Sequence, residues 1–114
     1  MKQILIATAL IALVPSALLA EAGYWTDREI CRAATKTYFF TSSRPADAPD
    51  QGDRLGFISD SGNIYTCRIE GTSVAFYWVN DSGETMESSS SSFSIVGDQL
   101  HVRTDMMEEI FEVE

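Results

Sequence analysis

Two cysteines, Cys31 and Cys67, are the most reactive side chains of this sequence. Such a pair can carry redox or nucleophilic chemistry, or it can form a structural disulfide. Redox motifs place two cysteines three positions apart, whereas these lie about 36 residues apart, and no histidine is close to either in sequence. We therefore expect a Cys31–Cys67 disulfide. By closing this loop, the bond would stabilise the fold by roughly 3–4 kcal/mol, since it lowers the entropy of the unfolded chain.

His101 is the only histidine and hence the natural candidate for a general base or a metal ligand. It stands between Leu100 and Val102, and strand alternation would send these two inward and His101 to solvent. A catalytic base or a transition-metal centre needs partner groups, and spacing identifies none. We expect no metal site and no catalytic role for His101.

Three aspartates, Asp47, Asp50 and Asp53, follow one another at intervals of three. Calcium binds oxygen ligands on a turning backbone, so this segment is a candidate calcium loop. The spacing differs from the alternate-residue pattern of an EF-hand, and Pro49 interrupts it. A solvated acidic loop is the favoured interpretation, and calcium binding is the alternative.

Glutamates crowd the C-terminal segment at positions Glu108, Glu109, Glu112 and Glu114. Paired carboxylates catalyse acid–base reactions when they are buried beside a substrate. Alternation would instead send Glu112 and Glu114 outward and Glu109 toward the face of Phe111. We favour a charged strand edge that prevents sheet-to-sheet aggregation.

Aromatic residues provide the remaining lead, because six Phe, four Tyr and two Trp are many for a domain of this size. Tyr77 alternates away from Phe76 and Trp78, which places it on the open face of the predicted sheet. Tyr24 and Trp25 precede the predicted helix. Exposed aromatics on an acidic surface can form a binding patch. The alternative is that Trp25 packs against the first helical turn and that the loop covers Tyr77.

The charge balance excludes several classes of function. The 114 residues carry eight Lys or Arg against seventeen Asp or Glu, for a net charge of −9. Nucleic-acid binding requires a cationic face, and binding to an anionic membrane surface is disfavoured for the same reason. No Gly-x-Ser-x-Gly elbow and no phosphate-binding glycine loop is present, so we expect no enzyme and no cofactor.

The first 22 residues have the form of a secretion signal. Lys2 provides the positive start, an apolar run follows from residue 4 to 14, and Ala20 and Ala22 fit the small-x-small cleavage rule. Cleavage after either alanine satisfies the rule. The run is shorter than the ~20 residues that span a bilayer, so we expect a cleaved signal and no membrane insertion of the mature chain. Residues 23–114 then form one small domain in the periplasm or outside the cell, where a disulfide is stable.

The rest of the chain predicts an α+β fold. Residues 26–29 (Thr-Asp-Arg-Glu) are a capping box, and small apolar residues at helical spacing extend the helix over 27–40. A loop is expected over 41–52. The strands expected in an antiparallel meander of five or six cover residues 53–60, 64–70, 73–80, 92–96, 99–104 and 109–113. Cys31 lies on the helix and Cys67 on the second strand, so the disulfide would join helix to sheet.

The serines at 88–92 admit two interpretations. A run of five serines can form a flexible tip or a recognition loop. The favoured alternative is a polar edge or the exposed start of a strand. The sequence Asn-Asp-Ser at 80–82 matches the glycosylation acceptor pattern, and we interpret it as a turn.

Three segments carry a resemblance to known proteins. Residues 29–34 (Glu-Ile-Cys-Arg-Ala-Ala), 65–71 (Tyr-Thr-Cys-Arg-Ile-Glu-Gly) and 93–100 resemble a group of small, uncharacterised exported proteins of proteobacteria over most of the mature chain. Residues from Ser61 to Tyr65 are also similar to the Ser-Gly-x-x-Tyr motif of periplasmic lysozyme inhibitors. The second inhibitor motif, with a Lys-Gly pair, is missing, and those proteins do not begin with this helix. The first resemblance implies export and fold; the second implies inhibition of a cell-wall hydrolase.

We therefore expect a non-enzymatic exported binding or accessory domain that recognises an envelope protein. The alternative is an inhibitor of a basic cell-wall hydrolase such as lysozyme, since an acidic surface would accelerate that encounter. The candidate binding residues are Tyr24, Trp25, Ser61, Tyr65 and Tyr77.

Overall fold

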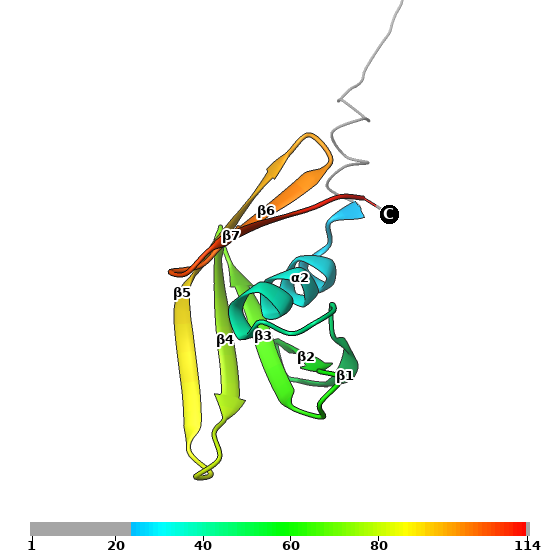
Figure 1. Cartoon of the computed structure of the whole chain (residues 1–114). Helices are drawn as coiled ribbons and strands as arrows, with labels where there is room; N and C mark the ends of the chain where they lie inside the picture. Colours follow the sequence, from blue (N-terminus) through cyan, green and yellow to red (C-terminus); the bar gives the residue numbers. More distant parts are fainter. Residues whose placement is uncertain (1–23, 114) are drawn as a thin grey trace, which may run out of the picture.

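The computed structural model describes residues 24–113, which form a helix and a seven-stranded antiparallel sheet (Figure 1). The expected secretion signal and Glu114 lie outside these residues. The elements in chain order are α2 (Asp27–Phe39), β1 (Ala46–Gln51), β2 (Arg54–Ile58), β3 (Ile64–Glu70), β4 (Ser73–Val79), β5 (Thr85–Val96), β6 (Gln99–Arg103) and β7 (Glu108–Phe111). The α+β class and the antiparallel meander are confirmed.

Helix α2 begins at the predicted capping box. The Thr26 hydroxyl accepts a hydrogen bond from the Glu29 backbone N–H at 3.3 Å, while Asp27 and Glu29 place negative charge at the positive end of the helix dipole. The helix ends at Phe39 because Phe40 adopts the left-handed conformation, with φ of 55°. Its end is therefore one residue earlier than predicted.

The seven strands follow one another in space in sequence order, so every neighbouring pair is a hairpin. The expected count of five or six was wrong because residues 41–52 are not all loop: β1 occupies Ala46–Gln51 and pairs with β2. Pro49 lacks the N–H that a central strand needs, but β1 is an edge strand and its register shifts between Ala48 and Gln51, so Pro49 is tolerated.

Strand β5 begins seven residues before the predicted start and contains the whole serine run. Its first part pairs with β4, and its last part pairs with β6. The register places Ser88 opposite Phe76 and Ser91 opposite Val74, so Ser89 and Ser90 face the single residue Ala75 in a bulge. A flexible serine tip is therefore wrong, and the strand interpretation of the run is confirmed.

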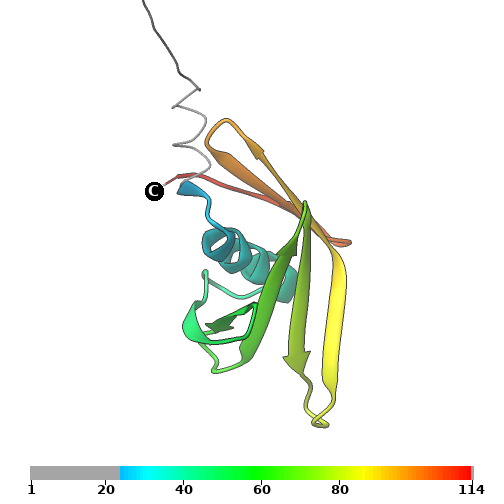
Figure 2. The same ribbon diagram turned by 180° about the vertical axis from the view of Figure 1, so that it is seen from behind.

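The sheet curls around α2, which contacts every strand from β2 to β7 (Figures 1 and 2). Small residues on the buried face of the helix, Ala33 and Ala34, allow this close approach. The core between helix and sheet consists of Trp25, Ile30, Cys31, Ala33, Ala34, Phe57, Cys67, Val74, Phe76, Leu100, Val102 and Phe111.

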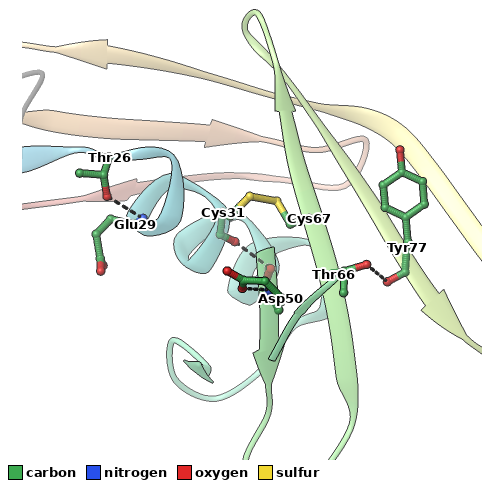
Figure 3. The surroundings of a disulfide bond; sticks show 9 residues. Thr26, Glu29, Cys31, Asp50, Thr66, Cys67 and Tyr77 are labelled. Atoms are coloured by element: carbon green, nitrogen blue, oxygen red, sulfur yellow. Dashed lines mark hydrogen bonds between the residues drawn. A yellow bond between two sulfur atoms is a disulfide. The ribbon is translucent and has the colours of Figure 1, made fainter. Parts of the chain in front are cut away.

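The predicted disulfide joins Cys31 of α2 to Cys67 of β3, with 5.9 Å between the Cα atoms (Figure 3). Both cysteines are fully buried in the core. The bond therefore links the helix directly to the middle of the sheet it covers.

Gly56 of β2 is required by the close approach of β1. A Cβ atom at this position would overlap the carbonyl oxygen of Pro49 and would lie 2.8 Å from that of Ala48. The Gly56 N–H also donates a hydrogen bond to the Asp50 carboxylate at 2.9 Å. The glycine thus allows β1 to pack closely against the middle of β2.

We predict that replacing Cys31 and Cys67 together by alanine lowers the melting temperature by more than about 10 °C. The loss follows from the entropy of the opened loop, roughly 3–4 kcal/mol, at several degrees per kcal/mol for a domain of this size. Differential scanning calorimetry measures the shift. Chemically reduced wild-type protein is the control that separates the bond from the packing, and an equal melting temperature for oxidised and reduced protein would contradict the prediction.

We predict that Gly56→Ala displaces β1 and destabilises the fold by about 1–3 kcal/mol, as overpacking at a closed site does. Hydrogen exchange should show faster exchange of the β1 amides together with a lower urea midpoint. Gly52→Ala is the matched control, because a Cβ there meets no atom within 4 Å and costs only the strain of a φ of 64°. Wild-type protection of β1 in Gly56→Ala would refute this interpretation.

Candidate functional site

Three surface hollows meet around Asn63 at one end of the molecule. The largest, of about 410 Å³, lies over β2–β5, and the others, of about 270 and 250 Å³, continue toward the C-terminal end of α2. Asn63 lines all three, because it closes the turn between β2 and β3. We call this region the hairpin-end surface and define it by Phe40, Ser61, Asn63, Ile64 and Val79.

The hairpin-end surface exposes large apolar side chains. The exposed fractions are 63% for Phe40, 52% for Ile64 and 63% for Val79. Ile64 and Val79 both line the largest hollow, and Phe40 lines one of its neighbours. Exposed apolar groups around a hollow are typical of contact surfaces for a partner or ligand.

The turn that carries Ser61 is held rigidly. The Ser59 N–H donates to the Asn63 carbonyl and the Gly62 N–H donates to the Ser59 carbonyl, both at 2.9 Å. The Ser61 hydroxyl lies 3.0 Å from that of Ser59 and accepts from the Asn63 side-chain amide at 3.3 Å. Gly62 has a φ of 91°, a conformation that glycine adopts without strain. Ser61 is therefore exposed in a preformed turn.

Tyr77 lies on the outer face of the sheet, turned away from the helix and disulfide (Figure 3). Its placement on that face agrees with the prediction from alternation. The ring is nevertheless only 8% exposed, because the Arg54 guanidinium stacks on it at 3.5 Å from the ring centroid. Arg54 and Tyr77 together line the largest hollow.

The other candidate aromatics are placed differently. Tyr65 stacks on Phe39 with 3.9 Å between ring centroids, so it anchors the end of the helix. Trp25 is buried and donates from its indole nitrogen to the Asp98 carbonyl at 2.9 Å, and Tyr24 packs edge-on against it. None of the three hollows around Asn63 includes Tyr24 or Trp25. Of the five candidate binding residues, Ser61, Tyr65 and Tyr77 therefore line these hollows. Tyr24 and Trp25 do not.

The three candidate calcium ligands each face an arginine. Asp47 accepts from Arg32 at 2.7 Å, Asp50 accepts from Arg28 at 2.7 Å, and Asp53 accepts from Arg68 at 3.1 Å. The Gly56 N–H and the Arg28 guanidinium hold the pKa of the Asp50 carboxyl below its usual range. Within residues 24–113, no group of three or more His, Cys, Asp or Glu side chains is arranged to hold a metal ion.

His101 is on the outer face, as predicted, but it has neighbours that spacing did not reveal. Its Nε2 lies 3.3 Å from Gln99 Oε1, and its Nδ1 lies 3.5 Å from Glu108 Oε2. Glu109 points inward, as predicted, and binds Lys36 at 2.7 Å and Thr37 at 2.9 Å. Glu108 and Glu109 therefore lie on opposite faces of β7 and do not form a catalytic pair.

Sequence reasoning missed Arg54, Phe40, Asn63, Ile64 and Val79 at this surface. A signal was available for two of them: Ile64 and Val79 are aliphatic residues on the strand faces that alternation turns outward. No sequence signal identified Arg54, because its contact with Tyr77 depends on the register of three strands.

This chain matches no protein-family model, no curated protein and no solved structure. In residues 24–113, no helix has the length and apolar character needed to cross a bilayer.

Proposed function

We propose that this protein is an exported, non-enzymatic domain that binds another component of the cell envelope through the hairpin-end surface. The observation that carries the proposal is the set of exposed apolar side chains, Phe40, Ile64 and Val79, which line hollows that share Asn63. Apolar area buried on association contributes roughly 25 cal/mol per Å², so these three side chains can supply much of a moderate affinity.

The lining of the largest hollow supports binding rather than bond-breaking chemistry. Its polar groups are amides and hydroxyls from Gln51, Asn63, Thr66 and Thr85, together with the Arg54 guanidinium and the Tyr77 phenol. The described lining contains no carboxylate, imidazole or thiol. A few fixed polar groups beside apolar ones orient a ligand, whereas acid–base catalysis needs a group that titrates near working pH.

Export is supported by two independent features. The first 22 residues have the composition of a cleaved signal, and the structural disulfide is of the kind that persists in oxidising compartments. We therefore place the mature domain in the periplasm or outside the cell.

We predict that Ile64→Ser combined with Val79→Ser weakens capture of a stoichiometric envelope partner about tenfold or more, because central apolar contacts dominate interfaces. Pull-down from an envelope extract, followed by mass spectrometry and titration of the isolated partner, measures the effect. The matched control is Val96→Ser with Ile110→Ser, since these side chains are 56% and 50% exposed on the outer face elsewhere. Equal loss in both double variants would refute the assignment of this surface.

The second candidate function is inhibition of a basic cell-wall hydrolase. The specific observation that favours it is the preformed turn that exposes Ser61, in the segment similar to the inhibitor motif. A net charge of −9 would accelerate encounter with a basic enzyme. Tyr65 of the same motif is buried on Phe39, so it supports the turn and is not itself available for contact.

Under this second candidate, a molar excess of the protein slows turnover by a basic lysozyme at low ionic strength, and added salt relieves the inhibition. Ser61→Arg should weaken inhibition by about tenfold or more, because it places bulk and positive charge at the contact. Ser82→Arg in the neighbouring exposed turn is the control for charge alone. Lysozyme turnover that is unaffected by excess protein would remove this candidate and leave the binding proposal intact.

A further inference from the structure

Most positive side chains of this acidic chain are already paired with carboxylates. Within residues 24–113, a carboxylate lies within 4 Å of each of Arg28, Arg32, Lys36, Arg68 and Arg103. Arg54 differs: in the same part of the chain it has no carboxylate partner and no hydrogen-bond acceptor, only the ring of Tyr77. A guanidinium without an acceptor, in a chain with such an excess of carboxylates, marks Arg54 as a site for an external anion.

The Tyr77 ring holds the Arg54 guanidinium in a defined plane. Stacking at 3.5 Å uses one face of the guanidinium, whereas its N–H groups lie in its own plane and stay available. Tyr77 is itself fixed, since it is buried and its carbonyl accepts from the Thr66 hydroxyl at 3.5 Å (Figure 3). The donors of Arg54 are therefore pre-organised, which reduces the entropy cost of binding a planar anion.

The surroundings of Arg54 specify what else the ligand should carry. Ile64 and Val79 line the same hollow and are more than half exposed, and Asn63 and Gln51 add amide groups. A ligand that reaches Arg54 with an anionic group would lay its neighbouring atoms on these aliphatic side chains. A carboxylate joined to an apolar group satisfies both parts of the hollow.

The register of the sheet favours a singly charged ligand. Glu87 of β5 is the cross-strand partner of Tyr77 and shares its outer face. Its negative charge would oppose a phosphate dianion more strongly than a carboxylate, because the repulsion grows with the charge of the ligand.

We infer that the hollow formed by Arg54, Tyr77, Ile64 and Val79 binds a carboxylate carried on an apolar group, as at the end of a peptide chain with an apolar last residue. The guanidinium of Arg54 holds the carboxylate by two parallel N–H donors, and Ile64 and Val79 contact the apolar group. This inference rests on the proposed binding function and assigns the ligand chemistry of the same surface.

Nuclear magnetic resonance titration tests this inference with three probes: 3-phenylpropionate, its neutral amide 3-phenylpropanamide, and inorganic phosphate. The carboxylate should shift the Arg54 Nε–H signal and the Ile64 and Val79 methyl signals together, with the amide and phosphate each binding at least about tenfold more weakly. Arg54→Gln should weaken carboxylate binding by about tenfold or more, whereas the control Arg103→Gln, at an exposed outer-face arginine, should not.

Equal binding of the amide, stronger binding of phosphate, or undiminished carboxylate binding to Arg54→Gln would each overturn the inference. These outcomes are distinct from failure of the proposed function, which the serine variants at Ile64 and Val79 report. A partner that is lost from those variants but retained by Arg54→Gln would uphold the binding surface and reject the carboxylate site.

Discussion

The disulfide between Cys31 and Cys67 joins helix α2 to strand β3, and the arrangement of helix and sheet depends on this bond. Strand β3 lies between β2 and β4, and its inner face packs on α2. With the helix held there, the sheet curls around it and leaves its other face to solvent (Figures 1 and 2). Because strand side chains alternate, residues of β3 and β4 that do not face the helix must form the outer surface.

Core and candidate site therefore occupy opposite faces of the same two strands. Cys67 and Phe76 point into the core, while their neighbours Thr66 and Tyr77 point to the hollow over β2–β5. The core supplies the rigidity that a binding surface needs, and substitutions on the outer face leave the core packing in place. Ile64 and Val79 are more than half exposed, so substitutions at these two positions should have little effect on stability.

Cations of the helix pair with acidic side chains at the two edges of the sheet. Arg28 and Arg32 reach from the helix to Asp47 and Asp50 at the β1 edge, and Lys36 reaches Glu109 on β7. Exposed ion pairs contribute roughly 0–1 kcal/mol each, so these contacts position the edge strands more than they stabilise them. Pro49 and the glutamates of β7 also make the two edges poor templates for pairing with other sheets.

Much of the fold could be predicted because its signals are local. The capping box and small apolar residues determined the helix, and period-two alternation located β3, β4 and β6 and the orientations of Tyr77, His101 and Glu109. The disulfide pairing followed from there being two cysteines. Local periodicity reports which face a side chain occupies, and it does so without knowledge of distant partners.

Only the tertiary structure decided β1, the length of β5 and the composition of the candidate site. Residues 46–51 lack the apolar alternation that predicts a strand. Backbone pairing with β2 and ion pairs with arginines of the helix hold β1 instead, and neither is visible in its own sequence. The serines of β5 form a strand because they pair with the apolar strand β4. The composition of the serine run does not reveal this pairing. Arg54 reaches Tyr77 across β3, so their contact depends on two strand registers that no single segment encodes.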